Sequence, residues 1–181
     1  MIVQPDFARL IPELQAWNNG KGIDAESWIR CIGRFDHAVG YAQLFWPEFT
    51  VHDDCIMFAD FTVESYETWM KHTSGRRGQV EAVMNHRHIL DLFSSDESDV
   101  SRELVLYLGR MLHDMWACKL KRDFPDRDIV VSFPDEHYEN LLDYEITIYH
   151  QKYVNQPWIA PLTRSAPRPS PSTPARSRAG G

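Results

Sequence analysis

The sequence contains eight histidines, and two of them, His86 and His88, flank a single arginine. On an extended backbone, residues two apart point to the same side and can share a metal ion. The apolar positions around them instead recur with helical spacing, which predicts a helix over residues 79–93. These positions are Ala82, Val83, His86, Ile89, Leu90 and Phe93. Side chains two apart on a helix are separated by about 200°, so we expect His86 in the core, His88 in solvent, and no shared ion.

The dipeptide His113-Asp114 suggests a second kind of metal site. Imidazoles and carboxylates can hold a divalent ion that activates water for hydrolysis. In this dipeptide the chain resembles the helical metal-dependent phosphohydrolases, which carry a His, a His-Asp pair and a later Asp as ligands. The resemblance implies the ligands His86, His113, Asp114 and Asp143 and a divalent-metal-dependent hydrolase. The helical pattern places His113 and Asp114 on the polar side of their segment, where Arg110 and Asp114 form an i,i+4 pair.

A third candidate site is the exposed loop His52-Asp53-Asp54, which separates two short apolar runs. Loops on a rigid scaffold are where binding residues concentrate, so we expect these three residues to bind a partner. The alternative is simple turn chemistry, because aspartate is favoured in tight turns. A cluster of aromatic residues also has two explanations. It could bind a small ligand, or it could simply be part of the packed core. It consists of Tyr41, Phe45, Trp46 and Phe49.

Several strong signatures of catalysis are absent from the sequence. It contains no GxxxxGK[ST], GxGxxG, GxSxG or HExxH motif. The three cysteines, Cys31, Cys55 and Cys118, show no CxxC spacing, so neither a zinc knuckle nor a disulfide framework is indicated. Cys31 and Cys118 fall within helical patterns, where we expect small buried thiols. The preferred interpretation therefore includes no metal and no other cofactor.

The charge of the chain bears on its partners. The net charge is −7, and residues 160–181 hold four arginines and no acids, so residues 1–159 carry −7 − 4 = −11. An acidic body disfavours nucleic-acid binding, because affinity for nucleic acid comes largely from neutralising phosphates with Lys and Arg. Negative charge instead favours a basic protein partner.

These observations lead to two hypotheses for function. The first is a non-catalytic acidic protein-interaction domain, such as an inhibitory or immunity-type partner of a basic protein. The second is the divalent-metal-dependent hydrolase that uses the His-Asp pair. Size and charge are the basis of the first hypothesis, and one dipeptide is the basis of the second.

The pattern of apolar residues predicts the fold class. Residues 101–122 form the longest uninterrupted helical pattern, which Ser101 or Asp99 can cap. Shorter helices are expected at the N-terminus, where Pro12 must start or kink the first, and Asp24 can cap the second. The second helix has an apolar face, which we expect to lie in the core, made of Trp28, Ile29, Ile32 and Phe35. Asp36 can cap a further helix over residues 37–46, which ends just before Pro47, and Thr62 can cap another.

Residues 49–51 and 55–58 predict a hairpin, and residues 129–133 and 144–149 predict two pairing strands. We therefore predict an α+β fold: a mostly helical single domain with a long central helix and a small antiparallel sheet.

The composition changes towards the C-terminus. Residues 1–159 are predicted to form one globular domain, whereas the Pro-, Arg- and Ser-rich residues 160–181 are predicted to be disordered. The start of the chain has neither a basic leader nor a long apolar run. We therefore expect no signal peptide, no membrane span and a cytoplasmic location.

Overall fold

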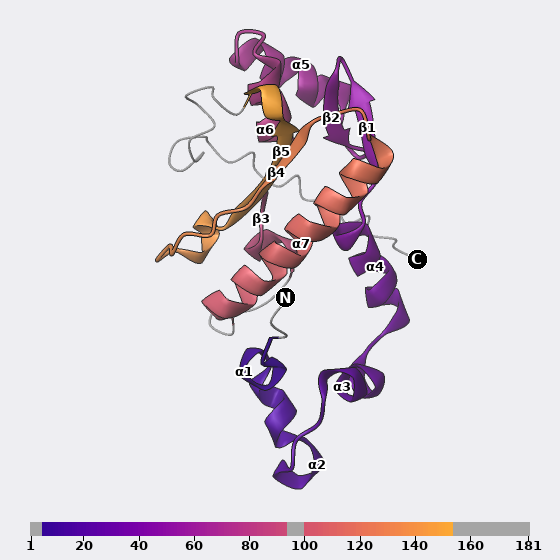
Figure 1. Ribbon diagram of the computed structural model, residues 1–181, viewed down its shortest axis with the longest axis vertical. Helices are drawn as coiled ribbons and strands as arrows, with labels where there is room; N and C mark the ends of the chain where they lie inside the picture. The colour runs from indigo at the N-terminus through magenta and orange to yellow at the C-terminus, as the bar shows by residue number, and fades with distance from the viewer. Residues whose placement is uncertain (1–4, 94–99, 154–181) are drawn as a thin grey trace, which may run out of the picture.

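The computed structural model describes residues 5–93 and 100–153 (Figure 1). The chain forms an α+β domain with one long helix and small antiparallel sheets. Its helices are α1 (Phe7–Leu10), α2 (Trp17–Gly20), α3 (Ala25–Ile32), α4 (Phe35–Phe45), α5 (Val63–His72), α6 (Arg77–Met84) and α7 (Arg102–Asp123). Its strands are β1 (Phe49–His52), β2 (Cys55–Phe58), β3 (Arg87–His88), β4 (Ile129–Ser132) and β5 (Glu145–His150). Short 3-10 turns cover Pro12–Ala16, Leu90–Leu92, Leu141–Asp143 and Gln151–Tyr153.

The central element is α7, which begins after Ser101 as predicted. The Ser101 hydroxyl accepts a hydrogen bond from the backbone N–H of Leu104, which satisfies one of the free donors of the first turn. One side of α7 is fully buried and packs on the sheet, and its buried residues include Val105, Leu112, Trp116 and Leu120. The opposing side chains come from the alternating face of β5, which was also predicted, and include Ile146 and Ile148.

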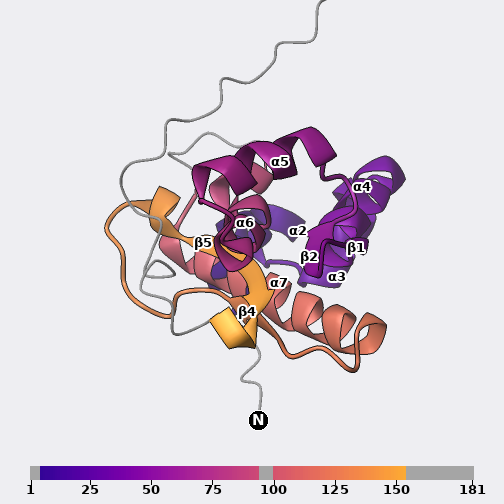
Figure 2. The ribbon, with the colours of Figure 1, turned by 90° about the horizontal axis from the view of Figure 1, so that it is seen from above.

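Two antiparallel sheets lie side by side. The first is the hairpin β1-β2, and the second has the order β3-β5-β4, with Val131 opposite Ile148 in the β4-β5 pair. Seen from above, β5 lies between α6 on one side and α7 on the other (Figure 2). The hairpin and the β4-β5 pair therefore confirm the sequence prediction.

Side chains of α6 and of its C-cap residue, Asn85, connect the two sheets. Glu81 and Asn85 are one helical turn apart and both fully buried. Glu81 accepts hydrogen bonds from the backbone N–H groups of Ile56 (2.7 Å) and His150 (2.9 Å). Asn85 donates to the carbonyl of Ile56 (2.7 Å) and accepts from the N–H of Phe58 (3.2 Å). Strands β2 and β5 thus satisfy buried backbone groups through α6 rather than through each other.

The N-terminal helices α1–α3 lie at the end of the molecule opposite α5 and α6, and α4 connects them to the hairpin (Figure 1). Pro12 starts a 3-10 turn, and Asp24 caps α3 by accepting from the N–H of Ser27, both as predicted. The helix that follows begins at Phe35, one residue before its predicted cap, and Thr62 caps α5 as predicted. Neither α3 nor α4 contains a buried residue.

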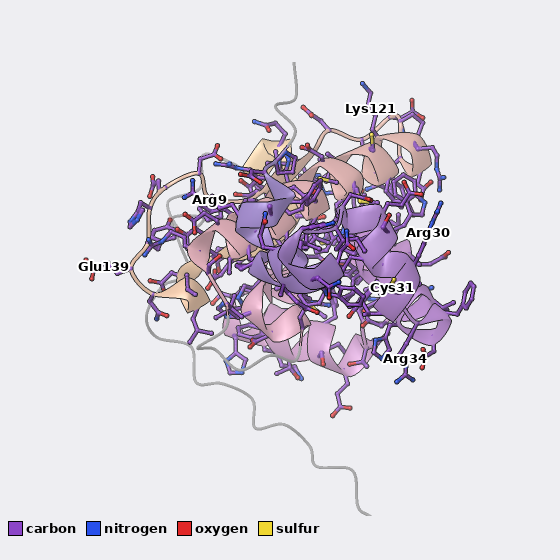
Figure 3. The ribbon with its side chains drawn as sticks, turned by 90° about the horizontal axis from the view of Figure 1, so that it is seen from below. Arg9, Arg30, Cys31, Arg34, Lys121 and Glu139 are labelled. Atoms are coloured by element: carbon purple, nitrogen blue, oxygen red, sulfur yellow. The ribbon has the colours of Figure 1, made fainter. Side chains whose placement is uncertain are left out.

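Three sequence predictions about local structure are wrong. The helix over residues 79–93 ends at Met84, and residues 87–88 are a strand. The predicted core face of α3 is largely exposed: Ile29, Ile32 and Phe35 are exposed, and only Trp28 is partly buried. Cys31, labelled in Figure 3, and Cys118 are exposed, and only Cys55 is buried. Helical periodicity alone does not determine whether another part of the fold covers a helix.

Within residues 5–93 and 100–153, no helix combines the length and the apolar character needed to cross a membrane. The predicted boundary at residue 159 and the predicted disordered tail, residues 160–181, lie outside the described residues.

Candidate functional site

The predicted binding loop His52-Asp53-Asp54 is the turn of the β1-β2 hairpin. Asp53 and Asp54 have positive φ values of 48° and 65°, a backbone conformation that Asp tolerates better than most residues. His52 stacks against the rings of Phe61 and Tyr66, with centroids 5.1 and 4.7 Å away. The loop is therefore a tight turn whose histidine packs inward against α5.

Both aspartates of this turn are held by cations from elsewhere in the chain. Asp53 accepts two hydrogen bonds from the Arg77 guanidinium, at 2.7 and 3.1 Å, and one from the hydroxyl of Tyr66 at 2.9 Å. The Tyr66 hydrogen bond, followed by that of Arg77, lowers the pKa of Asp53. These contacts give the carboxylate a structural role in fixing the turn on α6.

Asp54 is bound in the same way on the other side of the turn. It contacts Lys152 at 3.2 Å and Arg127 at 2.9 Å, and these hydrogen bonds lower its pKa, that of Lys152 contributing most. The turn-chemistry alternative thus accounts for both aspartates, and binding of a partner by residues 52–54 remains a prediction.

The residues proposed for a hydrolase lie on different elements. His113 and Asp114 contact each other on α7, with Nδ1 and Oδ1 2.9 Å apart, and the Asp114 side chain is 71% exposed. Asp143 lies in the 3-10 turn before β5, and His86 precedes β3. Among the described residues, the group of His, Cys, Asp and Glu side chains close enough to share an ion is His86, His88 and Glu145. It includes His86 but none of the other three residues.

A pocket of about 450 Å³ lies near the end of α4, but its lining includes none of the predicted aromatic residues Tyr41, Phe45, Trp46 and Phe49. Its walls come from α4, β2, β3 and α7, and they include Leu44, Phe58, Arg87 and Trp116. The Arg87 guanidinium lies 4.5 Å from the centre of the Phe58 ring and 3.9 Å from Asp60. Since Arg87 already has these partners, the pocket shows no set of converging polar groups that defines a ligand.

A different feature, which sequence analysis assigned to the core, is the apolar surface of α3 and α4. Four aliphatic or phenyl side chains on these consecutive helices are exposed: Ile29 by 58%, Ile32 by 45%, Phe35 by 94% and Val39 by 68%. We call these four residues the arm surface. On each helix the two side chains are three or four positions apart, which places them on one face. The signal in the sequence was the amphipathic pattern itself, which marks a face that needs a partner.

Charged residues close in sequence to the arm surface are paired with each other. Arg30 contacts Glu26 at 2.6 Å, and Arg34 contacts Asp36 at 2.5 Å. Figure 3 shows Arg30, Cys31 and Arg34 pointing outward on this part of the molecule, on the opposite side of the view from Glu139. The charged side chains of α3 and of the start of α4 therefore neutralise each other.

Comparison of the chain with protein-family models, with curated proteins and with solved structures finds no match in any of the three.

Proposed function

We propose that this chain is a non-catalytic protein-interaction domain, which binds a basic protein through the arm surface. The observation that carries the proposal is the exposure of Phe35, which is 94% accessible and is one of four exposed apolar side chains on α3 and α4. Isolated apolar residues are normal on a protein surface, but a group on consecutive amphipathic helices is typical of an interaction site.

The weak anchoring of α3 supports an interface. This helix has eight residues and no buried side chain. Helices this short are marginal on their own, and their stability in proteins comes mainly from packing of an apolar face. A partner that covers Ile29 and Ile32 would supply that packing, at about 1.5–3 kcal/mol for each fully buried side chain.

Trp28 supplies a second, independent observation. Its indole N–H is buried and has no acceptor within the described part of the chain. A buried donor without a partner costs about 1–3 kcal/mol. A small rearrangement of α3 on binding would allow this group to reach an acceptor, which would favour the bound state.

The charge of the chain supports a basic partner. Directly after α4, residues 48–67 contain six acidic residues and neither lysine nor arginine. Asp53 and Asp54 are neutralised by cations from other segments, whereas Glu48, Asp60, Glu64 and Glu67 are exposed. Negative potential on the molecule that carries the apolar surface would speed association with a basic protein and disfavour acidic ones.

An inhibitory or immunity-type partner of a basic protein would have this combination of features. A cytoplasmic location is part of the proposal, because Cys31 and Cys118 are exposed free thiols, which persist in a reducing compartment.

The experiment compares capture by the wild-type chain with capture by two variants. Phe35→Ser combined with Val39→Ser removes the apolar side chains from α4. His37→Ser is the matched control, because residue 37 lies about 200° around the helix from residue 35. We expect the wild type and the control to retain one basic protein in stoichiometric amount, and the double variant to bind it at least about 100-fold more weakly. The association rate should fall with added salt.

Three results would contradict the proposal. The first is the absence of a stoichiometric partner, and the second is a partner that the double variant retains with full affinity. The third is a monomer-dimer equilibrium in sedimentation velocity that the double variant abolishes, since it would assign the arm surface to a second copy of the chain. Circular dichroism of each variant checks that the fold is intact.

A further inference from the structure

The fold brings two histidines and one glutamate together at the edge of the second sheet. Residues 86–88 are extended, so His86 and His88 lie on the same side of the backbone. Strand β3 pairs with β5 so that His88 is directly opposite Glu145. Cross-strand partners in an antiparallel pair have neighbouring side chains, which places Glu145 beside the two imidazoles.

The distances within this group suit a shared ion. The Nε2 atoms of His86 and His88 are 3.2 Å apart. Two nitrogen ligands of a tetrahedral zinc ion, each about 2.0–2.1 Å from the metal, lie about 3.3 Å apart. One ligand atom from each of the three residues lies within 4.8 Å of the other two.

The glutamate is close to both rings without forming a normal hydrogen bond to either. Its Oε1 atom is 3.6 Å from His86 Nε2 and 3.4 Å from His88 Nδ1. Both separations exceed the range of roughly 2.7–3.2 Å for N–H···O hydrogen bonds. An ion between these three groups would account for the position of the glutamate, which direct hydrogen bonding to the rings does not explain. The two imidazoles, with their Nε2 atoms 3.2 Å apart, are within hydrogen-bond distance of each other in the absence of an ion.

A backbone contact orients His88 for metal binding. Its Nδ1 lies 2.7 Å from the carbonyl oxygen of Leu142. A carbonyl can only accept, so Nδ1 carries the proton and donates, and the Nε2 lone pair remains available. Metal-bound histidines commonly donate their second N–H to a carbonyl or carboxylate in this way.

We propose that His86, His88 and Glu145 form a Zn²⁺ site, with the two Nε2 atoms and one carboxylate oxygen as ligands. His86 binds in the tautomer that carries its proton on Nδ1. The side chains are 26%, 28% and 18% exposed, so the ion can enter and water can occupy the fourth position. Two imidazoles and one carboxylate form the ligand set of open zinc sites. Zinc would also join the two-residue strand β3 to β5.

The experiment uses the full chain after treatment with EDTA and removal of the chelator. Titration calorimetry with ZnCl₂ should show one ion per chain, and Co²⁺ should give the visible absorption of a low-symmetry site. Each of His86→Gln, His88→Gln and Glu145→Gln should weaken zinc binding by at least about 100-fold, more than the roughly 10–100-fold typical of outer-shell partners. Zinc should raise the melting temperature of the wild type but not of these variants.

His113→Gln is the matched control, because it removes an imidazole on α7 outside the group. It should leave the affinity and the stoichiometry unchanged. The proposal is overturned if the wild type binds no zinc saturably, if both His86→Gln and His88→Gln keep wild-type affinity, or if His113→Gln abolishes binding. Melting curves of the metal-free variants separate loss of the site from loss of the fold.

Discussion

At the scale of single residues, the side chains of Glu81 and Asn85 form the hydrogen bonds to strand backbone that a neighbouring strand normally forms in a sheet. Both are fully buried, and both accept or donate hydrogen bonds at strands β2 and β5. A buried polar group is tolerated only when it is hydrogen-bonded, and here each side chain satisfies backbone groups as well as itself. These two residues determine how the hairpin joins the second sheet.

Replacement of Asn85 by Ala should destabilise the protein strongly. The change leaves the carbonyl of Ile56 and the N–H of Phe58 buried without a partner. At about 1–3 kcal/mol for each group, we expect the free energy of unfolding to fall by about 2–5 kcal/mol. Urea unfolding followed by tryptophan fluorescence measures the change. Glu67→Ala, at an exposed position on α5, should alter it by less than about 0.5 kcal/mol. A loss below about 1 kcal/mol for Asn85→Ala would show that the bridge does not hold the sheets together.

At the scale of secondary structure, long periodic segments were predictable and short connections were not. Helix α7 and the β4-β5 pair were identified because many residues repeat one period, and Ser101 is a standard cap. Residues 86–88 were assigned to a helix because His86 and Ile89 continue the apolar spacing of α6. Their extended conformation depends on pairing with β5, a contact between distant segments that local periodicity does not contain.

The candidate sites illustrate the same division. The sequence indicated that His86 and His88 could share an ion only if extended, but nothing near them pointed to Glu145. The apolar face of α3 was also identified correctly as a pattern. Amphipathicity shows which side of a helix can be buried, but whether the same chain provides the opposing layer depends on the tertiary fold. In this protein the described residues leave that face exposed.

Two glycines in helix interiors allow a matched test of packing around α7. A Cβ at Gly109 of α7 would lie 2.0 Å from the Phe133 ring, whereas a Cβ at Gly40 of α4 would have no atom within 4 Å. Alanine in a helix interior is more stable than glycine by about 0.5–1 kcal/mol when space allows. Gly40→Ala should therefore raise the free energy of unfolding by up to about 1 kcal/mol. Gly109→Ala should lower it by about 1–3 kcal/mol, because Phe133 must move. Chemical denaturation measures the free energy of unfolding of both variants. The same change in both would contradict the close packing of Phe133 on α7.

At the scale of the whole molecule, some acidic residues are paired with cations inside the fold, whereas others are exposed on the surface. The cations Arg77, Arg127 and Lys152 come from α6 and from the segments that flank β4 and β5, and all three converge on the hairpin turn. They neutralise Asp53 and Asp54, and these ion pairs connect the hairpin turn to α6 and to the segments that flank β4 and β5. The remaining acids on α5 and on the loop before β5 give the surface its negative potential. An acidic chain can therefore use some carboxylates for folding and leave others free for the proposed attraction of a basic partner.

The ion pairs of the turn predict how stability depends on pH. Both aspartates have lowered pKa values in the folded protein, chiefly through hydrogen bonds from Tyr66 to Asp53 and from Lys152 to Asp54. A lowered pKa stabilises the folded state above the unfolded value of about 3.9, and this stabilisation is lost as the pH falls through the folded values. Asp53→Asn combined with Asp54→Asn should therefore be less stable than the wild type at pH 7. The difference should shrink below about pH 4 and disappear once the folded carboxyls are protonated.

Asparagine also tolerates positive φ, so the substitution removes charge while keeping the turn. Urea unfolding between pH 7 and pH 2 measures the difference, with Glu67→Gln combined with Glu139→Gln as the control for net charge. A gap between wild type and the turn variant that stays constant over this range would show that the aspartates act through turn geometry and not through their ion pairs.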